Sequence, residues 1–361
     1  MNAIPMLGSL GSIALVATMG GNGAGGRQYL AAGMFLLATL GFVAVQIDRQ
    51  RARRGQQVSG ARTDYLRYLG TVRRHAREAA DEQRRALTWR HPEPASLPAI
   101  AEDGTRIWER ASADPDFLHV RYAVCDQPLA LDLIPPEDEP SDRVDPVAVT
   151  ALHRLLRVHR RQSGLPTSID LRAFDRIEVC GPEGPARSLA RAMICSAAAF
   201  HSPDDLVIAV LTSERFLAHW DWIKWLPHAQ SARQSDAIGA RRMVSTSLDQ
   251  LAELLPSDLL RAPIFEPGER TTPPHILVVL DGAELPPGNQ LVPPGGGRGV
   301  TVLDLPAQWD ELEDASRLRL EFEPVADTAE PADGRYPVRV LRVRDEPTTA
   351  SVDQCSLAVA E

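Results

Sequence analysis

The chain has 361 residues, with 39 basic and 48 acidic side chains and a formal net charge of −9. This length accommodates one large or two modest domains. The four cysteines form no C-x-x-C pair and no cluster with histidine, which argues against a zinc site and fits a reducing compartment. They are Cys125, Cys180, Cys195 and Cys355.

The N-terminal region is apolar. Ile4–Met19 is uncharged, and after a glycine-rich turn the run Tyr29–Ile47 carries only Thr39 and Gln46 as polar side chains. Each run approaches the roughly 20 residues needed to cross a bilayer, so we expect a transmembrane helical hairpin over residues 1–48. A signal peptide is the alternative, but no basic leader precedes the first run and a second run follows at once.

Arginines follow the second apolar run directly. By the positive-inside rule they place the next part of the chain in the cytoplasm. We therefore expect a multi-pass protein of the inner (cell) membrane whose soluble part is cytoplasmic. These arginines are Arg49, Arg51, Arg53 and Arg54.

Residues 49–95 read as a cytoplasmic stalk, mostly one long polar helix that ends at the segment His91–Pro94. A short apolar stripe at helical spacing runs along it. The arginines of the stalk are read as a solvated face, with anionic lipid as an additional contact near the membrane. The stripe consists of Tyr65, Leu66, Leu69 and Val72.

Strands alternate with helices in residues 96–345, which indicates an α/β domain with a parallel sheet. We expect a hairpin of 117–124 with 129–133, an acidic proline-rich linker at 135–140, and two closing antiparallel strands at 317–322 and 338–343. Residues 346–361 look like the start of a linker in a longer protein. The other expected strands are 176–180, 206–211, 276–280 and 300–303, and the expected helices are 147–161, 187–200, 214–226 and 243–255.

The segment Gly181–Ser188 lies between an expected strand and an expected helix, where a phosphate-binding P-loop, G-x-x-x-x-G-K-[ST], would lie. Gly181 and Ser188 are in register, and Gly184 adds a glycine within the turn, but Ala186 replaces the second motif glycine and Arg187 replaces the lysine. The segment also contains two prolines, which lack the N–H groups that a phosphate cradle needs. An ordinary strand–turn–helix junction is the alternative.

A second feature resembles the Walker-B strand of P-loop ATPases. The apolar run from His275 ends in Asp281, where such a strand carries a Mg²⁺-binding carboxylate. The next position, a water-activating glutamate in many such enzymes, is Gly282, and Glu284 lies on the following loop. The two features together predict a nucleotide site without hydrolytic residues, in which Ser188 and Asp281 leave weak ATP·Mg²⁺ binding open. A buried strand with a turn aspartate is the alternative.

Several stretches resemble EccC, the family of FtsK/SpoIIIE-type ATPases in actinobacterial type VII (ESX) secretion systems. The most specific is Trp220–His228, W-D-W-I-K-W-L-P-H, preceded by Phe200-His201-Ser202-Pro203. Further matches, in the expected order, are Trp89–Pro92, Trp108–Arg110, Asp114–Leu118 with Val120-Arg121, and Gly8–Ser12.

This resemblance implies two membrane helices, a stalk and a first, degenerate P-loop-NTPase-like (RecA/FtsK-like) domain, followed in the family by further FtsK-like ATPase domains. It also implies a hexamer and the membrane partners EccB, EccD and EccE. The cytoplasmic ubiquitin-like domain of EccD is the expected neighbour of the stalk. Secreted WXG100-type proteins are the implied cargo, recognised by domains beyond this chain.

The tryptophan segment also supports a prediction from spacing alone. On an α-helix Trp222 and Trp225 share a face and Trp220 points elsewhere, so some indole would be exposed or meet another part of the chain. Packing of the indoles in the core is the simpler interpretation, and contact of an indole with a partner protein is the more specific one. The interface candidates are Trp220, Trp222, Lys224, Trp225, Tyr65 and Leu69, with Lys224 able to pair with Asp221.

Two other functions stay open from the sequence. An FtsK-like DNA translocase would need a DNA-reading domain, and the basic stalk has no accompanying nucleic-acid motif. A scaffold that never binds nucleotide is the other alternative. No catalytic residue and no metal site is predicted.

Overall fold

The computed structural model describes residues 27–135, 145–256, 263–268, 273–283, 285–286, 289, 295–323, 335–343 and 345–360. In this described part, no helix is both long enough and apolar enough to cross a bilayer. The first predicted span, Ile4–Met19, lies outside the described residues, and within the helix that follows side chains are described from Thr39 onward.

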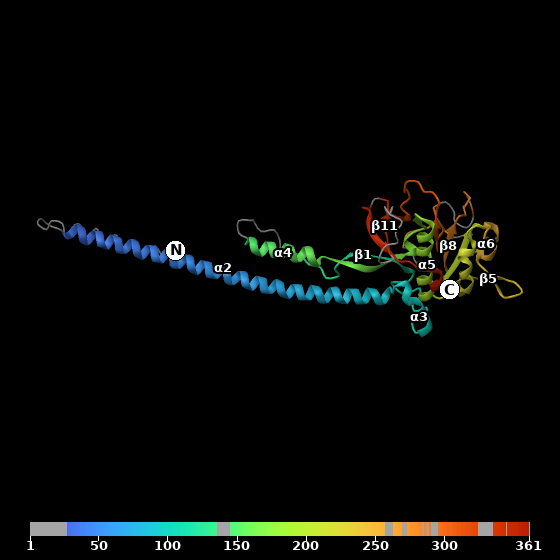
Figure 1. Ribbon diagram of the computed structural model, residues 1–361, viewed down its shortest axis with the longest axis horizontal. Coiled ribbons are helices and arrows are strands. Elements are labelled where there is room, and N and C mark those ends of the chain that lie inside the picture. The colour runs from blue at the N-terminus through green and yellow to red at the C-terminus, as the bar shows by residue number, and fades with distance from the viewer. Residues whose placement is uncertain are drawn as a thin grey trace. The chain divides into compact units, whose positions relative to one another are not determined.

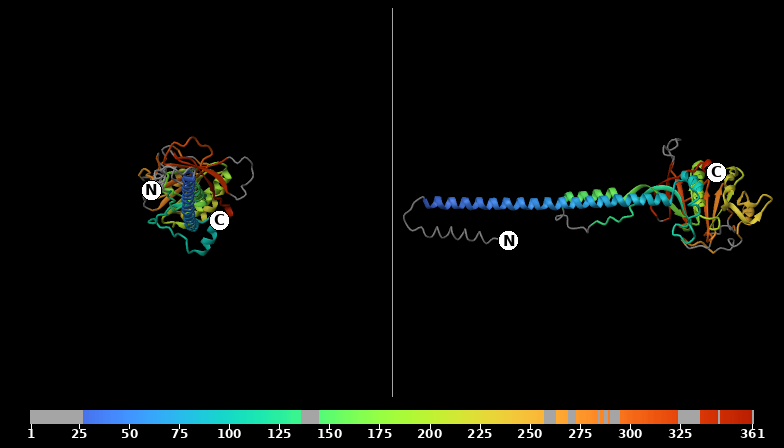
Figure 2. Two further views of the ribbon diagram at one scale, coloured as in Figure 1. Left: turned by 90° about the vertical axis from the view of Figure 1, so that its left-hand side faces the viewer. Right: turned by 90° about the horizontal axis from the view of Figure 1, so that it is seen from below.

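The chain divides into two compact units, residues 1–75 with 133–158, and residues 76–132 with 159–361. The helix α2, Arg27–Arg90, is continuous through the boundary between them and ends where the prolines begin, as predicted. The helix α4, Pro146–His159, covers Tyr65, Leu69 and Val72 of the apolar stripe, whereas Leu66 is exposed (Figure 1, Figure 2). Leu69 is buried there, Tyr65 packs beside it, and Arg62 forms a bidentate ion pair with Asp145.

The second unit is built on a ten-stranded sheet of order β2-β1-β12-β11-β10-β3-β9-β8-β4-β7. The strands are β1 His119–Pro128, β2 Arg161–Asp170, β3 Arg176–Cys180, β4 Leu206–Thr212, β7 Val244–Ser245, β8 His275–Asp281, β9 Val300–Leu305, β10 Arg317–Phe322, β11 Tyr336–Leu341 and β12 Thr348–Val352. A separate two-stranded ribbon pairs β5, Gln230–Ser235, with β6, Ala240–Arg242.

The half of the sheet from β10 to β7 is parallel throughout. The strand β8 is buried at every residue, as expected for a parallel strand covered on both faces. The helix α5, Glu183–Phe200, lies against the sheet (Figure 1) and buries Leu189, Met193, Ala197 and Phe200 in the core, as the sequence predicted.

The other half, from β2 to β11, is antiparallel and corrects the predicted hairpin. The strand β1 pairs with β2 and with β12, and residues 129–133 form no strand. The strand β2 was not predicted, because its first four residues are polar or glycine and form no apolar run. The strand β10 was expected to be antiparallel only, but it pairs in parallel with β3 as well as antiparallel with β11.

Three further predictions need correction. The expected helix 214–226 is a short 3₁₀ segment, η3 Leu217–Trp225, and the expected helix 243–255 contains β7 before α6, Leu248–Leu254. Residues 346–361 are not the start of a linker, because β12 lies between β1 and β11 within the sheet. The remaining helical segments are η1 Pro94–Ser96, α3 Leu97–Asp103, η2 Leu171–Ala173, η4 Pro227–Ala229 and α7 Leu357–Ala360.

Candidate functional site

The P-loop-like segment lies at the carboxyl end of β3 but forms no loop around a ligand. The strand ends at Cys180 and α5 begins at Glu183, so only Gly181 and Pro182 separate them. Gly184 and Ala186 are already in the first turns of the helix. A phosphate cradle needs consecutive N–H groups turned toward one point, and a two-residue connection cannot supply them.

Gly181 is required for packing. Its φ is +152°, and a Cβ atom at this position would lie 2.7 Å from the Cβ atom of Phe322. This separation is shorter than real Cβ contacts, so the strand-to-helix turn closes directly against β10. The glycine of the motif therefore serves the fold.

The side chains of Arg187 and Asp281 form a buried ion pair. The Nε atom of Arg187 lies 2.7 Å from Oδ2 of Asp281, and Nη2 lies 3.2 Å from Oδ1. The two side chains are 7% and 3% exposed. Two parallel N–H···O bonds make this the bidentate geometry that guanidinium and carboxylate groups favour.

Other groups complete the environment of the pair. Trp220 donates from Nε1 to Oδ2 of Asp281 at 2.9 Å, and Glu183 accepts from Nη1 of Arg187 at 3.2 Å. Burial alone lowers the pKa of a guanidinium, but hydrogen bonds and charge from Asp281 and Glu183 outweigh it and raise the pKa of Arg187. Arg187 therefore stays charged at neutral pH, and it is hydrogen-bonded to Asp281.

Phe216 closes the site over the ion pair. The Cζ atom of Arg187 lies 3.8 Å from the centre of its ring, a cation–π distance. Gly282 has φ +68°, and a Cβ atom there would meet the same ring at 2.6 Å. The position of the water-activating glutamate thus has neither a carboxylate nor space for one.

Ser188 does not join this group. Its hydroxyl donates to the carbonyl oxygen of Cys355 at 3.0 Å and accepts from the amide nitrogen of Cys355 at 3.0 Å. The structure therefore brings together the predicted site residues Arg187 and Asp281, whereas Ser188 is hydrogen-bonded to the segment after β12. No group of three or more metal-ligating side chains occurs among the described residues.

These residues do not fit ATP·Mg²⁺. A magnesium ion at Asp281 would have to displace a guanidinium that already makes two hydrogen bonds there, and Mg²⁺ takes oxygen ligands in octahedral geometry. The carboxylate, the hydroxyl and the guanidinium are each satisfied by groups of the chain itself. The arrangement stabilises the end of the sheet and offers no reactive group.

The interface candidates separate into two sets. Trp220 and Trp222 are 0% and 2% exposed, so they belong to the core and line no surface, and Leu69 is also buried. Trp225 is 70% exposed, and Lys224 lies 5.4 Å from its ring and pairs with Asp221 at 2.5 Å. The predicted shared face of Trp222 and Trp225 is wrong, because Trp222 is buried with Trp220 whereas Trp225, the last residue of η3, is exposed.

Four of the stretches that carry the family resemblance, those with Arg110, Leu118, His201 and His228, meet around His201 in the second unit. Leu118 donates from its amide nitrogen to Nε2 of His201 at 2.9 Å, and Nε2 of His228 lies 2.8 Å from the carbonyl oxygen of His201. Arg110 stacks over Phe200 at 4.5 Å. Burial is the main reason that the pKa of His201 falls to about 4, so this histidine is neutral and acts as a hydrogen-bond centre.

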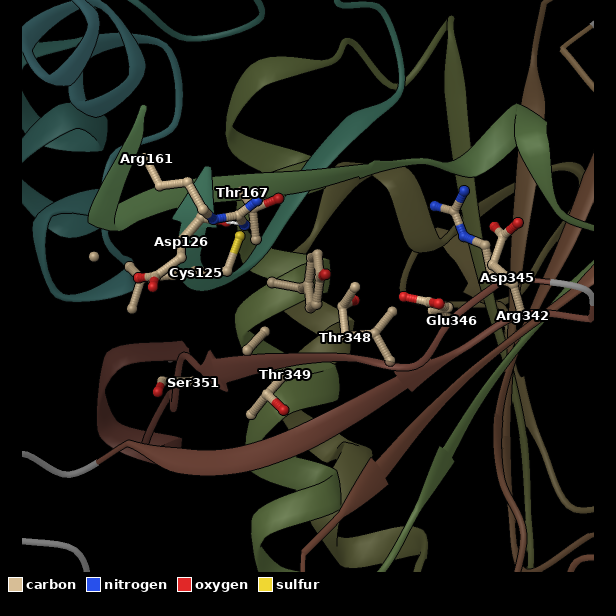
Figure 3. Close-up of a pocket in the computed structure, with 15 residues that line it drawn as sticks. Cys125, Asp126, Arg161, Thr167, Arg342, Asp345, Glu346, Thr348, Thr349 and Ser351 are labelled. Atoms are coloured by element: carbon tan, nitrogen blue, oxygen red, sulfur yellow. Dashed lines mark hydrogen bonds between the residues drawn. The ribbon is translucent and has the colours of Figure 1, made fainter. Parts of the chain in front are cut away.

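A large cavity of about 890 Å³ lies elsewhere, over the antiparallel half of the sheet. Figure 3 shows hydroxyl side chains such as Thr348 and Thr349 between a group with Arg161 and Asp126 and a group with Arg342, Asp345 and Glu346. The sequence analysis did not identify this cavity, because its walls come from strands that are distant in sequence.

Sequence reasoning also missed part of the closed site. No role was predicted for Glu183 or Phe216, and Trp220 was predicted as a core or interface residue and not as a partner of Asp281. A buried aspartate beside an arginine required further partners, but no spacing rule pointed to an indole 61 residues away.

Comparison with known proteins identifies related chains. The ESX secretion system protein EccC of Thermomonospora curvata is 39% identical over 297 residues, 82% of this chain and 22% of that protein. The ESX-4 secretion system protein EccC4 of Mycobacterium tuberculosis is 34% identical over 343 residues, 94% of this chain and 26% of that protein. The chain thus spans about a quarter of the length of these relatives. No protein-family model matches it.

One solved structure with some likeness is the cytoplasmic domain of the Thermomonospora curvata type VII secretion ATPase EccC. It has a TM-score of 0.35 and 13% sequence identity, and the match covers 74% of this chain and 32% of that one. A likeness at this level supports no argument about the fold.

Proposed function

Since the chain is a homologue of the EccC proteins of ESX secretion systems, we propose that it is the membrane-anchored, non-hydrolysing part of a type VII secretion ATPase. The second unit is a RecA/FtsK-like domain in this proposal, and its nucleotide site is degenerate. Its role is to connect the ATPase domains of a longer protein to the export channel.

One observation supports the non-hydrolysing role above all others: the bidentate ion pair of Arg187 with Asp281 at the carboxyl ends of the parallel strands. In open α/β sheets this edge is where ligands bind. Here a guanidinium takes the place of the cation and an aromatic ring covers it. The geometry favours a domain that holds no nucleotide over the weak ATP·Mg²⁺ binding that Ser188 and Asp281 alone would allow.

Membrane anchoring rests on the sequence. The runs Ile4–Met19 and Tyr29–Ile47 supply two apolar stretches of nearly bilayer length, and the arginines after the second set the orientation. The soluble part then lies in the cytoplasm at the inner (cell) membrane. By homology we propose a hexamer with EccB, EccD and EccE as partners, the EccD ubiquitin-like domain beside the stalk, and WXG100-type proteins as cargo.

The scaffold function is the second candidate, and the closed site favours it over a DNA translocase. A scaffold needs rigid connections. The second unit has them at both ends of α5, with the ion pair at the start and the His201 group at the end. We therefore treat the domain as a fixed structural part of the motor.

Nucleotide binding tests the proposal. Isothermal titration of the full 361-residue chain with ATP·Mg²⁺ is expected to give no binding heat up to millimolar nucleotide, and a coupled assay is expected to give no turnover. The matched control is Asp281→Asn, which removes the carboxylate charge and should not change either result. Binding or turnover by the unaltered chain that this variant abolishes would refute the closed site.

A further inference from the structure

Two cysteines that are distant in sequence lie together beside the start of α5. Ser188, Arg191 and Cys195 are spaced by three and four residues on this helix, so they follow one another along one face. The segment after β12 lies across that face. The carbonyl oxygen of Cys355 accepts from the Ser188 hydroxyl and from Nε of Arg191, each at 3.0 Å.

The same contact brings the two sulfur atoms together. The side chains of Cys195 and Cys355 interact with each other, and the Cys355 thiol also donates to the carbonyl oxygen of Ser356 at 3.5 Å. Cys355 is buried and Cys195 is half-buried, and neither is in a disulfide. The sequence analysis had described all four cysteines as lacking a close partner, and this pair corrects that description.

The surroundings favour a thiolate at Cys355. The side-chain interaction with Cys195 lowers the pKa of Cys355, and the nearby charge of Arg191 lowers it further against the opposing effect of burial. The same interaction raises the pKa of Cys195, and burial raises it further. A thiol of lowered pKa next to a guanidinium and a second, half-buried thiol has the composition of a dithiol pair that can be oxidised.

We propose that Cys195 and Cys355 form a reversible disulfide that fixes the segment after β12 to α5. This modification site is independent of the proposed function. Its consequence is mechanical: the hydrogen-bonded contact with Ser188 and Arg191 becomes covalent, so the chain leaving the sheet can no longer separate from the helix.

The reaction is balanced with a peroxide as the oxidant. The Cys355 thiolate attacks one oxygen of hydrogen peroxide, which gives a sulfenic acid and releases hydroxide. Cys195 then attacks the sulfenic sulfur, the sulfur–sulfur bond forms, and water leaves after taking up the proton of the Cys195 thiol. Two thiols lose two electrons to the peroxide, and a dithiol reductant reverses the change.

The test uses the full chain, reduced and then exposed to hydrogen peroxide. After free thiols are blocked with N-ethylmaleimide, mass spectrometry of the tryptic digest is expected to show one linked peptide pair, Cys195 with Cys355. The crosslink closes a loop of about 160 residues, so we expect the midpoint of thermal unfolding to rise by about 5–15 °C over the reduced chain. Dithiothreitol should remove both effects.

Variants distinguish this pair from general oxidation. Cys125→Ser, at a half-buried thiol of β1, should retain the linked peptide, whereas Cys195→Ser should lose it and leave Cys355 as a sulfenic acid that dimedone traps. Cys355→Ser should lose the peptide as well. Recovery of both thiols as maleimide adducts while Cys125 oxidises, or a linked peptide that includes Cys125 or Cys180, would overturn the proposal.

Discussion

Arg187→Ala is expected to lower the free energy of unfolding by about 3–5 kcal/mol, because it leaves the buried carboxylate of Asp281 without a counter-charge. Trp220 remains as a hydrogen-bond donor to that carboxylate, but a neutral indole does not compensate a buried negative charge. The cation–π contact with Phe216 is lost as well. Urea-induced unfolding followed by circular dichroism measures the change.

Two further variants test whether the loss comes from the unpaired charge. Arg215 also stacks on Phe216 and approaches Glu183, but its side chain is 74% exposed, so Arg215→Ala should change stability by less than about 1 kcal/mol. The double variant Arg187→Met with Asp281→Leu removes both charges and should recover at least half of the lost stability. If Arg187→Ala proves no more damaging than Arg215→Ala, the ion pair does not hold this part of the sheet.

Arg121→Ala is expected to have an effect of similar size, about 3–5 kcal/mol, at the other end of the sheet. Arg121 lies on β1 and binds both oxygens of Asp353 at 2.6 and 3.0 Å, and it also donates to the carbonyl oxygen of His91. Both side chains of this pair are almost fully buried. The substitution therefore leaves Asp353 buried with only the longer contact to Arg335.

Arg339→Ala supplies the matched control, since Arg339 is exposed on β11 in the same half of the sheet. It should leave the free energy of unfolding within about 0.5 kcal/mol of that of the unaltered chain. Equal effects of the two substitutions would mean that the Arg121–Asp353 pair does not hold residues 348–353 in the sheet.

The sequence predicted the four central strands of the parallel half because they are locally encoded. The strands β3, β4, β8 and β9 are short apolar runs, and the apolar face of α5 repeats at helical spacing. Such patterns need no information about distant partners. The strand β3, which precedes α5, was identified for the same reason.

The antiparallel half depends on pairing between distant segments. β12 lies between β1 and β11, although more than 200 residues separate it from β1, and three of its five side chains are polar. No local pattern showed that Thr348–Val352 belongs in a sheet, so these residues were read as part of a linker. The long sequence separation between β1 and β12 also explains why the hairpin prediction chose the nearer, incorrect segment.

The candidate site, like the sheet, has a part that local sequence predicted and a part that depends on distant segments. Motif spacing identified Arg187 and Asp281, and the structure pairs them. Motif spacing could not show that α5 begins at Glu183, which leaves no room for a phosphate-binding loop. Nor could it show that Phe216 and Trp220, from the segment after β4, close the site. Substituted motif residues indicated a damaged cradle, whereas the geometry shows a pair of charges that satisfy each other.

The account depends on the Arg187–Asp281 pair remaining closed when nucleotide is abundant. The most direct measurement is a crystal structure of the chain grown with Mg²⁺ and a non-hydrolysable ATP analogue. We predict that Arg187 will still contact both oxygens of Asp281 under the ring of Phe216, with no triphosphate at the start of α5. A triphosphate bound by the guanidinium of Arg187 and the amides that follow Gly181, with Mg²⁺ at Asp281, would contradict the account.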